Sequence, residues 1–104
     1  MNRGDIYRVR TTGKSGHEQQ GARYAVILQS DALLRLSTVV VAPTSRSAQP
    51  ASFRPLIEID DTPTRVMLDQ LTAVDINRLA KRVGHLQVEE TWAIDDATRL
   101  ILSL

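Results

Sequence analysis

The chain has 104 residues, of which 42% are hydrophobic and 24% charged, and its formal net charge at pH 7 is +1. This length suits one domain, residues 1–104, and the hydrophobic fraction excludes wholesale disorder. The lack of cysteine excludes disulfides, thiolate nucleophiles and cysteine-ligated zinc. No segment reaches the ~18 apolar residues of a membrane helix and no signal peptide opens the chain, so we expect a cytoplasmic protein without a membrane partner.

Charge is unevenly divided along the chain. Residues 1–54 carry a net charge of +5, and residues 55–104 carry a net charge of −4. A basic half predicts a polyanionic partner, unless folding mixes the two halves over the surface.

The first half alternates short apolar runs with turn residues. Strands are predicted at residues 5–10, 24–29 and 38–42. Residues 11–22 contain three glycines and only Ala22 as an apolar anchor, which predicts a long loop that is mobile or functional. Asp31 is expected to cap a single helical turn over residues 31–34.

In the second half, strands are predicted at residues 53–59, 65–74 and 82–86, with a turn at residues 60–64. A short helix is predicted at residues 75–80 and one long helix at residues 88–102. The fifth strand, 65–74, is expected to bend around Asp69-Gln70. The long helix has an apolar stripe, formed by Ile94, Ala97, Ile101 and Leu104. Trp92 and Leu100 fall off that stripe, which indicates either partial exposure or a dimer contact.

These elements predict a mainly β fold with about six short antiparallel strands, a few helical turns and a C-terminal α-helix. Closure into a small barrel would remove the exposed sheet edges.

The apolar runs 24–28 and 39–42 stand on either side of a short connection. If they pair antiparallel, the start of the first lies near the end of the second. Arg23 would then sit beside Thr44, Ser45 and Arg46. Two guanidiniums and two hydroxyls at one sheet edge would suit a phosphate. The alternative is that the arginines are solvated strand ends and that the hydroxyls only shape a turn.

Short motifs along nearly the whole chain, in the same order and spacing, resemble one known family: Met1-Asn-Arg-Gly-Asp-Ile-Tyr, Gly16-His-Glu-Gln, Leu28-Gln-Ser-Asp, Thr38-Val-Val-Val-Ala-Pro, Leu68-Asp-Gln-Leu, Val74-Asp-Ile-Asn-Arg-Leu, Val83-Gly-His-Leu and Ile94-Asp-Asp-Ala. The chain resembles the MazF/PemK toxins of bacterial toxin–antitoxin systems. That resemblance implies an SH3-like β-barrel with a C-terminal helix, found as a homodimer. It also implies metal-independent cleavage of single-stranded RNA at short sequences, with no cofactor and no DNA binding by the toxin itself. A cognate antitoxin with an acidic, disordered tail would silence it by filling the RNA groove.

The resemblance also implies roles for individual residues. Arg23 matches the family's catalytic arginine, although Tyr24 follows it where proline is usual. The catalytic hydroxyl is Thr44 by identity or Ser45 by position, with Thr44 preferred, because the chain is one residue short there. Asp69 and Gln70 match an acidic–glutamine pair that contacts RNA in relatives. Independently of the resemblance, Arg8 and Lys14 are expected to contact phosphates because they are basic and flank the predicted loop. The other candidate RNA-binding residues are Glu18, Gln19, Tyr24 and Arg46.

Metal-free cleavage can use the 2′-hydroxyl of the RNA as the nucleophile. It then requires charge stabilisation at the phosphate, which suits Arg23, and groups that accept and donate protons. His17 stands in the loop where relatives have serine, and its ordinary pKa near 6.5 would let it exchange protons, or it could only contact a base or solvent. His85 is expected to be structural. The carboxylates are scattered along the sequence, so no metal site is predicted.

Two alternatives remain open at the level of sequence. One is a protein-binding gyrase poison like CcdB, although those proteins depend on a Trp-Gly-Ile ending and this chain ends Leu-Ser-Leu. The other is an RNA-binding module that has lost catalysis, which Tyr24 and the shortened Pro43-Thr44 segment keep open.

Overall fold

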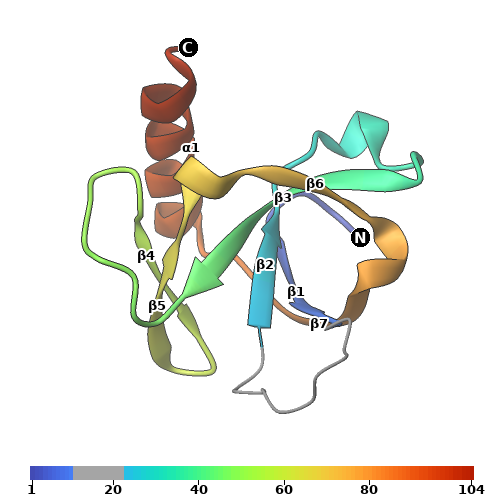
Figure 1. The fold of residues 1–104 in the computed structure, drawn as a ribbon, viewed down its shortest axis with the longest axis horizontal. Coiled ribbons are helices and arrows are strands. Elements are labelled where there is room, and N and C mark those ends of the chain that lie inside the picture. Colours follow the sequence, from blue (N-terminus) through green and yellow to red (C-terminus); the bar gives the residue numbers. More distant parts are fainter. Residues whose placement is uncertain (11–22) are drawn as a thin grey trace.

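The computed structural model describes residues 1–10 and 23–104, so the candidate residues Lys14, His17, Glu18 and Gln19 lie outside the described residues. The elements are, in chain order, β1 (Asp5–Val9), β2 (Arg23–Ile27), the 3-10 turn η1 (Asp31–Leu33), β3 (Thr38–Ser45), β4 (Leu56–Ile59), β5 (Thr62–Val66), η2 (Leu68–Gln70), β6 (Thr72–Asp75), η3 (Ile76–Arg78), β7 (Leu79–His85) and the helix α1 (Val88–Leu102) (Figure 1).

The eight-residue strand β3 organises the sheet. The strand order is β4-β5-β3-β2-β1-β7, and β6 also pairs with β3. One edge of β3 pairs with β2, while the other edge pairs first with β6 and then, at Thr44 and Ser45, with β5. All these pairings are antiparallel, and the sheet curls into a half-barrel with α1 beside it (Figure 1). The predicted fold class, a mainly β SH3-like barrel with a C-terminal helix, is confirmed.

Both faces of the central strands are buried, because successive side chains of a strand point to opposite faces. On one face, Val26 and Ala42 join a cluster with residues of β4, β5 and α1. On the other face, Ile27 and Val41 join a smaller cluster with Leu79 of β7. The near-continuous apolar runs of β2 and β3 therefore reflect burial on two sides.

Helix α1 packs by the predicted stripe, with one exception. Ile94 and Ala97 are buried, and Ile101 is half-buried against the same cluster. Leu104 lies beyond the end of the helix and is 80% exposed, so its predicted place on the stripe is wrong. The chain has already left the helix at Ser103, which adopts a left-handed conformation with φ 58°.

The prediction for residues 53–74 is wrong in its boundaries. The turn is limited to Asp60 and Asp61, both with positive φ, so β4 and β5 form a tight hairpin. Pro63 lacks a backbone N–H, yet it is tolerated inside β5. On its β3 side, β5 pairs only through Arg65 and Val66, so Pro63 has no partner in β3 that needs a donor. The predicted fifth strand is two strands, β5 and β6, separated by η2.

Three smaller expectations also need correction. Ser30, and not Asp31, caps η1, since its hydroxyl accepts the backbone N–H of Ala32. The Asp31 carboxylate accepts the backbone N–H of Arg3 at 2.6 Å. The short helix predicted over 75–80 is the single turn η3, and β7 already begins at Leu79. The described part of the chain thus contains seven strands where about six were expected.

Candidate active site

Arg23 is the first residue of β2, and it lies near the point where β3 stops pairing with β2. The last β2–β3 pair joins Ala25 to Pro43, and the next residues of β3 pair instead with β5. Arg23 is exposed, and Thr44 and Ser45 are half-buried at the end of β3. The antiparallel pairing predicted from the sequence is therefore present, and it brings the start of β2 to the end of β3. The two hydroxyl residues belong to the strand itself and not to a turn after it.

Both hydroxyls already have partners in the fold. The Thr44 hydroxyl donates to the backbone carbonyl of Tyr24 at 2.9 Å, just beyond the last ladder pair. The Ser45 hydroxyl accepts the backbone N–H of Ser47 at 3.1 Å and lies 3.4 Å from the Ser47 hydroxyl. Because a hydroxyl has one proton and two lone pairs, Thr44 must rotate away from Tyr24 before it can donate to a phosphate oxygen.

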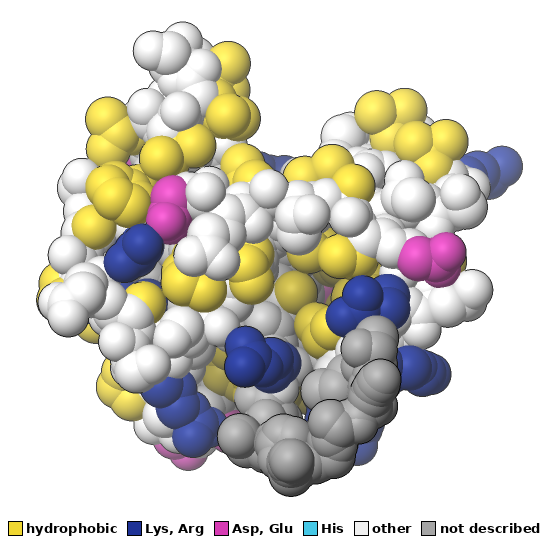
Figure 2. Space-filling view, viewed as in Figure 1, with side chains coloured by type: hydrophobic (Ala, Val, Ile, Leu, Met, Phe, Trp, Pro, Cys, Tyr) yellow, Lys and Arg dark blue, Asp and Glu magenta, His cyan; other side chains and the backbone are white. Residues whose placement is uncertain are grey.

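Basic side chains surround this end of the sheet. Arg8 pairs across β1 and β2 with Tyr24, and Val9 pairs with Arg23. Arg8 and Arg46 are exposed, and Figure 2 shows Lys and Arg side chains spread over this part of the surface. Val9, the last residue of β1, pairs with Arg23, the first residue of β2, so the end of β1 lies beside the candidate active site.

Asp69 and Gln70 lie in η2, beside the second half of β3. The strand before η2 pairs with Thr44 through Val66, and the strand after it pairs with Val41 through Thr72. The Asp69 carboxylate is held by Arg54, a residue that the sequence analysis did not single out. The hydrogen bond from the Arg54 guanidinium lowers the pKa of Asp69 below its ordinary value of 3.8. No sequence spacing links these two residues, since the hairpin of β4 and β5 separates them.

A second ionic cluster lies at the opposite end of β1. The buried Asp5 carboxylate accepts hydrogen bonds from His85 Nδ1 at 2.7 Å, Arg82 Nε at 3.0 Å and the Asn2 backbone at 2.8 Å. Burial alone would raise the pKa of Asp5, but these hydrogen bonds outweigh it and hold the pKa below 3.8. Gly4 has φ +93°, and a Cβ there would lie 3.1 Å from His85 Cε1. The cluster joins β1 to β7, which agrees with the structural role expected for His85.

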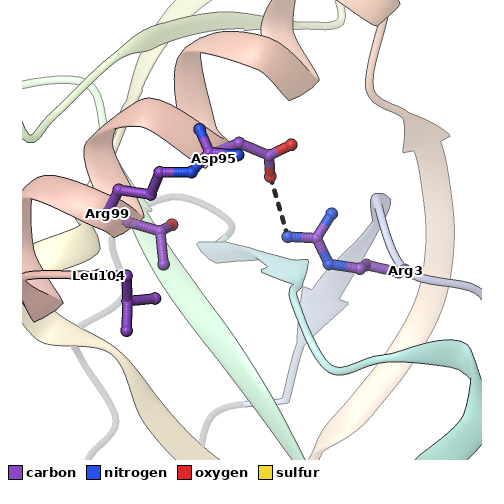
Figure 3. A pocket seen from close by; sticks show the side chains of 5 residues that line it. Arg3, Asp95, Arg99 and Leu104 are labelled. Atoms are coloured by element: carbon purple, nitrogen blue, oxygen red, sulfur yellow. Dashed lines mark hydrogen bonds and ion pairs between the residues drawn. The ribbon is translucent and has the colours of Figure 1, made fainter.

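A shallow cleft of about 260 Å³ lies between the N-terminal segment and α1, lined by Arg3, Asp95, Thr98, Arg99 and Leu104 (Figure 3). Arg3 Nη2 reaches Asp95 at 3.0 Å, and Arg3 Nε donates to the carbonyl of Leu28 at 2.9 Å. Leu28 follows the end of β2 that is opposite Arg23, roughly 16 Å away for five strand residues. The cleft is therefore separate from the candidate active site.

Metal ligands do not gather in the described part of the chain. Within residues 1–10 and 23–104, no three His, Asp or Glu side chains come together in a way that could hold a metal ion. None of the described helices is both long enough and apolar enough to cross a membrane.

Comparison with known proteins shows which family the chain belongs to. A sequence model of the PemK-like, MazF-like toxins of type II toxin–antitoxin systems matches residues 2–102. The chain belongs to this family. It is 30% identical over 111 aligned residues to the endoribonuclease EndoA of Bacillus subtilis, covering 100% of this chain and 96% of the relative. It is equally similar to the endoribonuclease MazF of Staphylococcus saprophyticus, covering 100% and 92% of the two chains.

Solved structures show the same MazF-like fold. A mycobacterial endoribonuclease in complex with its cognate antitoxin superposes with a TM-score of 0.80 at 20% identity, covering 100% of this chain and 96% of that chain. A Mycobacterium tuberculosis toxin, MazF-mt6, gives a TM-score of 0.79 at 18% identity, covering 96% and 97%. At these identities the likeness concerns the fold, and the family assignment rests on the sequence.

Proposed function

We propose that this MazF-like chain is the toxin of a type II toxin–antitoxin system and acts as a sequence-specific endoribonuclease on single-stranded RNA. Messenger RNA, transfer RNA and ribosomal RNA are the candidate substrates. The observation that carries the proposal is the position of Arg23. It is exposed at the start of β2, close to the end of β3 that contains Thr44 and Ser45. The full-length likeness to EndoA supports the reaction class.

The proposed reaction needs no metal ion. The ribose 2′-hydroxyl attacks the adjacent phosphorus, and the bond from phosphorus to the 5′-oxygen breaks. The products are a 2′,3′-cyclic phosphate and a 5′-hydroxyl, so one proton leaves the nucleophile and one is delivered to the leaving oxygen.

Arg23 stabilises the charge that builds on the phosphate, because its planar fork fits two non-bridging oxygens. Thr44 or Ser45 adds a hydrogen bond to the same group. Arg23 is a poor base, since a guanidinium stays protonated at ordinary pH. His17 therefore remains the proposed proton carrier, and it lies outside the described residues.

The proposed partners follow from the same site. A mycobacterial relative was solved with its cognate antitoxin, and we expect an antitoxin here whose acidic tail competes with RNA for the basic surface around Arg23. We also expect a homodimer that acts in the cytoplasm and does not bind DNA by itself.

The test is an RNA cleavage assay in EDTA with the wild-type chain, Arg23→Ala and Arg23→Lys. Arg23→Ala should lose cleavage, and Arg23→Lys should lose most of it because a point charge cannot replace the fork. Arg35→Ala, an exposed arginine before β3, is the matched control and should cleave normally.

The same assay separates the alternative functions. RNA binding without cleavage would indicate a module that has lost catalysis, and neither binding nor cleavage would favour a protein-binding poison. Near-native turnover of Arg23→Ala would contradict the assignment of Arg23. Cleavage that requires added magnesium or manganese would contradict the reaction class.

A further inference from the structure

Arg54 and Asp69 form a two-pronged ion pair at the edge of the candidate active site. Arg54 Nε donates to Asp69 Oδ1 at 3.1 Å, and Arg54 Nη2 donates to Asp69 Oδ2 at 2.8 Å. The side chains are 21% and 23% exposed, so the pair is partly shielded from water. This fork-to-fork geometry is the strongest arrangement that an arginine and a carboxylate can make.

The rest of the Arg54 guanidinium is also engaged. Arg54 Nη1 donates to the backbone carbonyl of Gln49 at 3.2 Å. The central guanidinium carbon, Cζ, lies 5.5 Å from the centre of the Phe53 ring. Arg65 donates to the backbone carbonyl of Arg54 at 2.9 Å. The Arg54 guanidinium is therefore already engaged by several groups of the fold and is not available as a free cation to bind a phosphate.

These contacts attach the segment before β4 to η2. The backbone N–H of Leu68, the first residue of η2, donates to the carbonyl of Phe53 at 3.3 Å, which adds a backbone bond beside the ion pair. The backbone N–H of Met67 donates to the carbonyl of Pro43 at 2.9 Å. The turn that carries Asp69 and Gln70 is thus fixed against β3, directly beside Thr44.

The ion pair changes what Asp69 can offer to RNA. Both of its carboxylate oxygens already accept from Arg54, which fixes the plane of the carboxylate, neutralises its charge and leaves one lone pair on each oxygen. A bare carboxylate beside the RNA would also repel its phosphates. Gln70 is exposed, and its amide can both donate to and accept from the edge of an unstacked base.

We propose that Arg54 and Asp69 form a clamp that positions Gln70 to read one base of the RNA, and that Asp69 acts through Arg54 without touching the RNA. The clamp makes Arg54 a positioning residue for sequence preference. This inference rests on the proposed endoribonuclease function.

The test is a double-mutant cycle on sequence preference. The kcat/KM ratio is measured for a preferred RNA oligonucleotide and for variants that each differ by one base, using the wild type, Arg54→Ala, Asp69→Ala and the double variant. Each single variant should reduce the preference at the same base by about tenfold, the order expected when one hydrogen-bonding group is misplaced. The double variant should be no worse than either single variant, because both remove the same clamp.

Further variants keep the test specific. The Asp96–Arg99 pair on α1 is a second arginine–aspartate pair, with side chains 81% and 61% exposed, and Asp96→Ala and Arg99→Ala should leave preference unchanged. Arg54→Lys keeps the charge but loses the fork, so it should restore only part of the preference. Gln70→Ala should lose preference at the same base as the clamp variants. If Asp69→Ala destabilises the fold, Asp69→Asn serves in its place.

The outcomes separate the clamp from the function on which it rests. If Asp69→Ala changes the preferred base and Arg54→Ala does not, Asp69 contacts RNA directly and the clamp is wrong. If neither variant changes the preference of an active enzyme, the clamp is likewise wrong. If the wild type cleaves no RNA in EDTA, the proposed function fails and the clamp fails with it.

Discussion

At the scale of single residues, the two hydroxyl groups at the end of β3 differ in their hydrogen-bond partners. The Thr44 hydroxyl donates to the carbonyl of Tyr24 and so connects β3 to the start of β2, whereas the Ser45 hydroxyl accepts only a local bond from the backbone N–H of Ser47. Removing the Thr44 hydroxyl would both loosen Arg23 and remove a donor for the phosphate. Thr44 therefore has the larger expected effect on catalysis.

Thr44→Val should lower kcat by about 100-fold, the order seen when one transition-state donor is removed. Thr44→Ser should keep most of the activity because the hydroxyl remains, and Ser45→Ala should have a small effect. Single-turnover cleavage of a short RNA measures this, with circular dichroism to check folding. A large loss in Ser45→Ala with an active Thr44→Val would assign the hydroxyl role to Ser45.

Asp5 makes stability depend on pH. Its folded-state pKa lies below the ordinary value of 3.8, so the ionised carboxyl stabilises the fold above that pH. This contribution is lost as the pH falls through the folded-state pKa. We expect Asp5→Asn to lower the free energy of unfolding at pH 7 by about 1–3 kcal/mol, because a buried hydrogen-bonded charge is removed. The variant should also lose less stability than the wild type on acidification below pH 3.8.

Urea unfolding between pH 2.5 and pH 7 measures both effects on stability. Asp60→Asn is the control, because Asp60 is exposed and Asn tolerates its left-handed backbone. A parallel pH dependence for the wild type and Asp5→Asn would show that other carboxyls govern acid unfolding.

At the scale of elements, Glu90 joins α1 to the edge of the sheet. One carboxylate oxygen accepts the backbone N–H of Gln87 at 2.8 Å in a capping box, and the other accepts the backbone N–H of Glu58 at 2.9 Å. The second bond satisfies a donor of β4, which is a terminal strand in the order of the sheet. A single side chain thus caps the helix and covers part of a strand edge.

Glu90→Ala should lower the free energy of unfolding by about 1–2 kcal/mol, since it removes a helix cap and leaves a strand N–H without its partner. Glu89→Ala is the matched control in the same first turn, and it keeps both of those bonds. Thermal unfolding followed by circular dichroism compares them. Equal melting temperatures for the two variants would show that the bonds of Glu90 contribute nothing measurable.

At the scale of the whole molecule, α1 exposes large apolar side chains in the part of the chain that the structure describes. Trp92 is 62% exposed and Leu100 is 58% exposed, while the opposite side of the helix is packed on the sheet. The prediction that these residues contribute to a homodimer interface therefore stays open, and the exposed side chains favour it.

Light scattering at micromolar concentration should give twice the chain mass of 11.6 kDa. Trp92→Lys and Leu100→Glu should shift the mass toward the monomer, because charged side chains would have to be buried in the interface. Arg99→Ala, on the same helix, is the control. A monomeric wild type would contradict the dimer.

The sequence by itself determined those features that depend on local patterns and short connections. Alternating and continuous apolar runs located β1, β2, β3 and α1 to within a few residues. The short link between β2 and β3 was enough to predict that Arg23 lies near Thr44 and Ser45, since neighbouring strands joined by a short link pair antiparallel. Motif order was enough to recognise the family that the comparison confirms.

Only the tertiary structure decided the contacts between distant parts of the chain. The apolar run 65–74 does not say which neighbour it pairs with, and it divides into β5 and β6 because both use the same edge of β3. Arg54 meets Asp69 after the β4–β5 hairpin folds back, and Asp5 meets His85 from 80 residues away. Hydrophobic periodicity records which face of a strand is buried, but it carries no information on which polar side chains will face each other once the sheet curls.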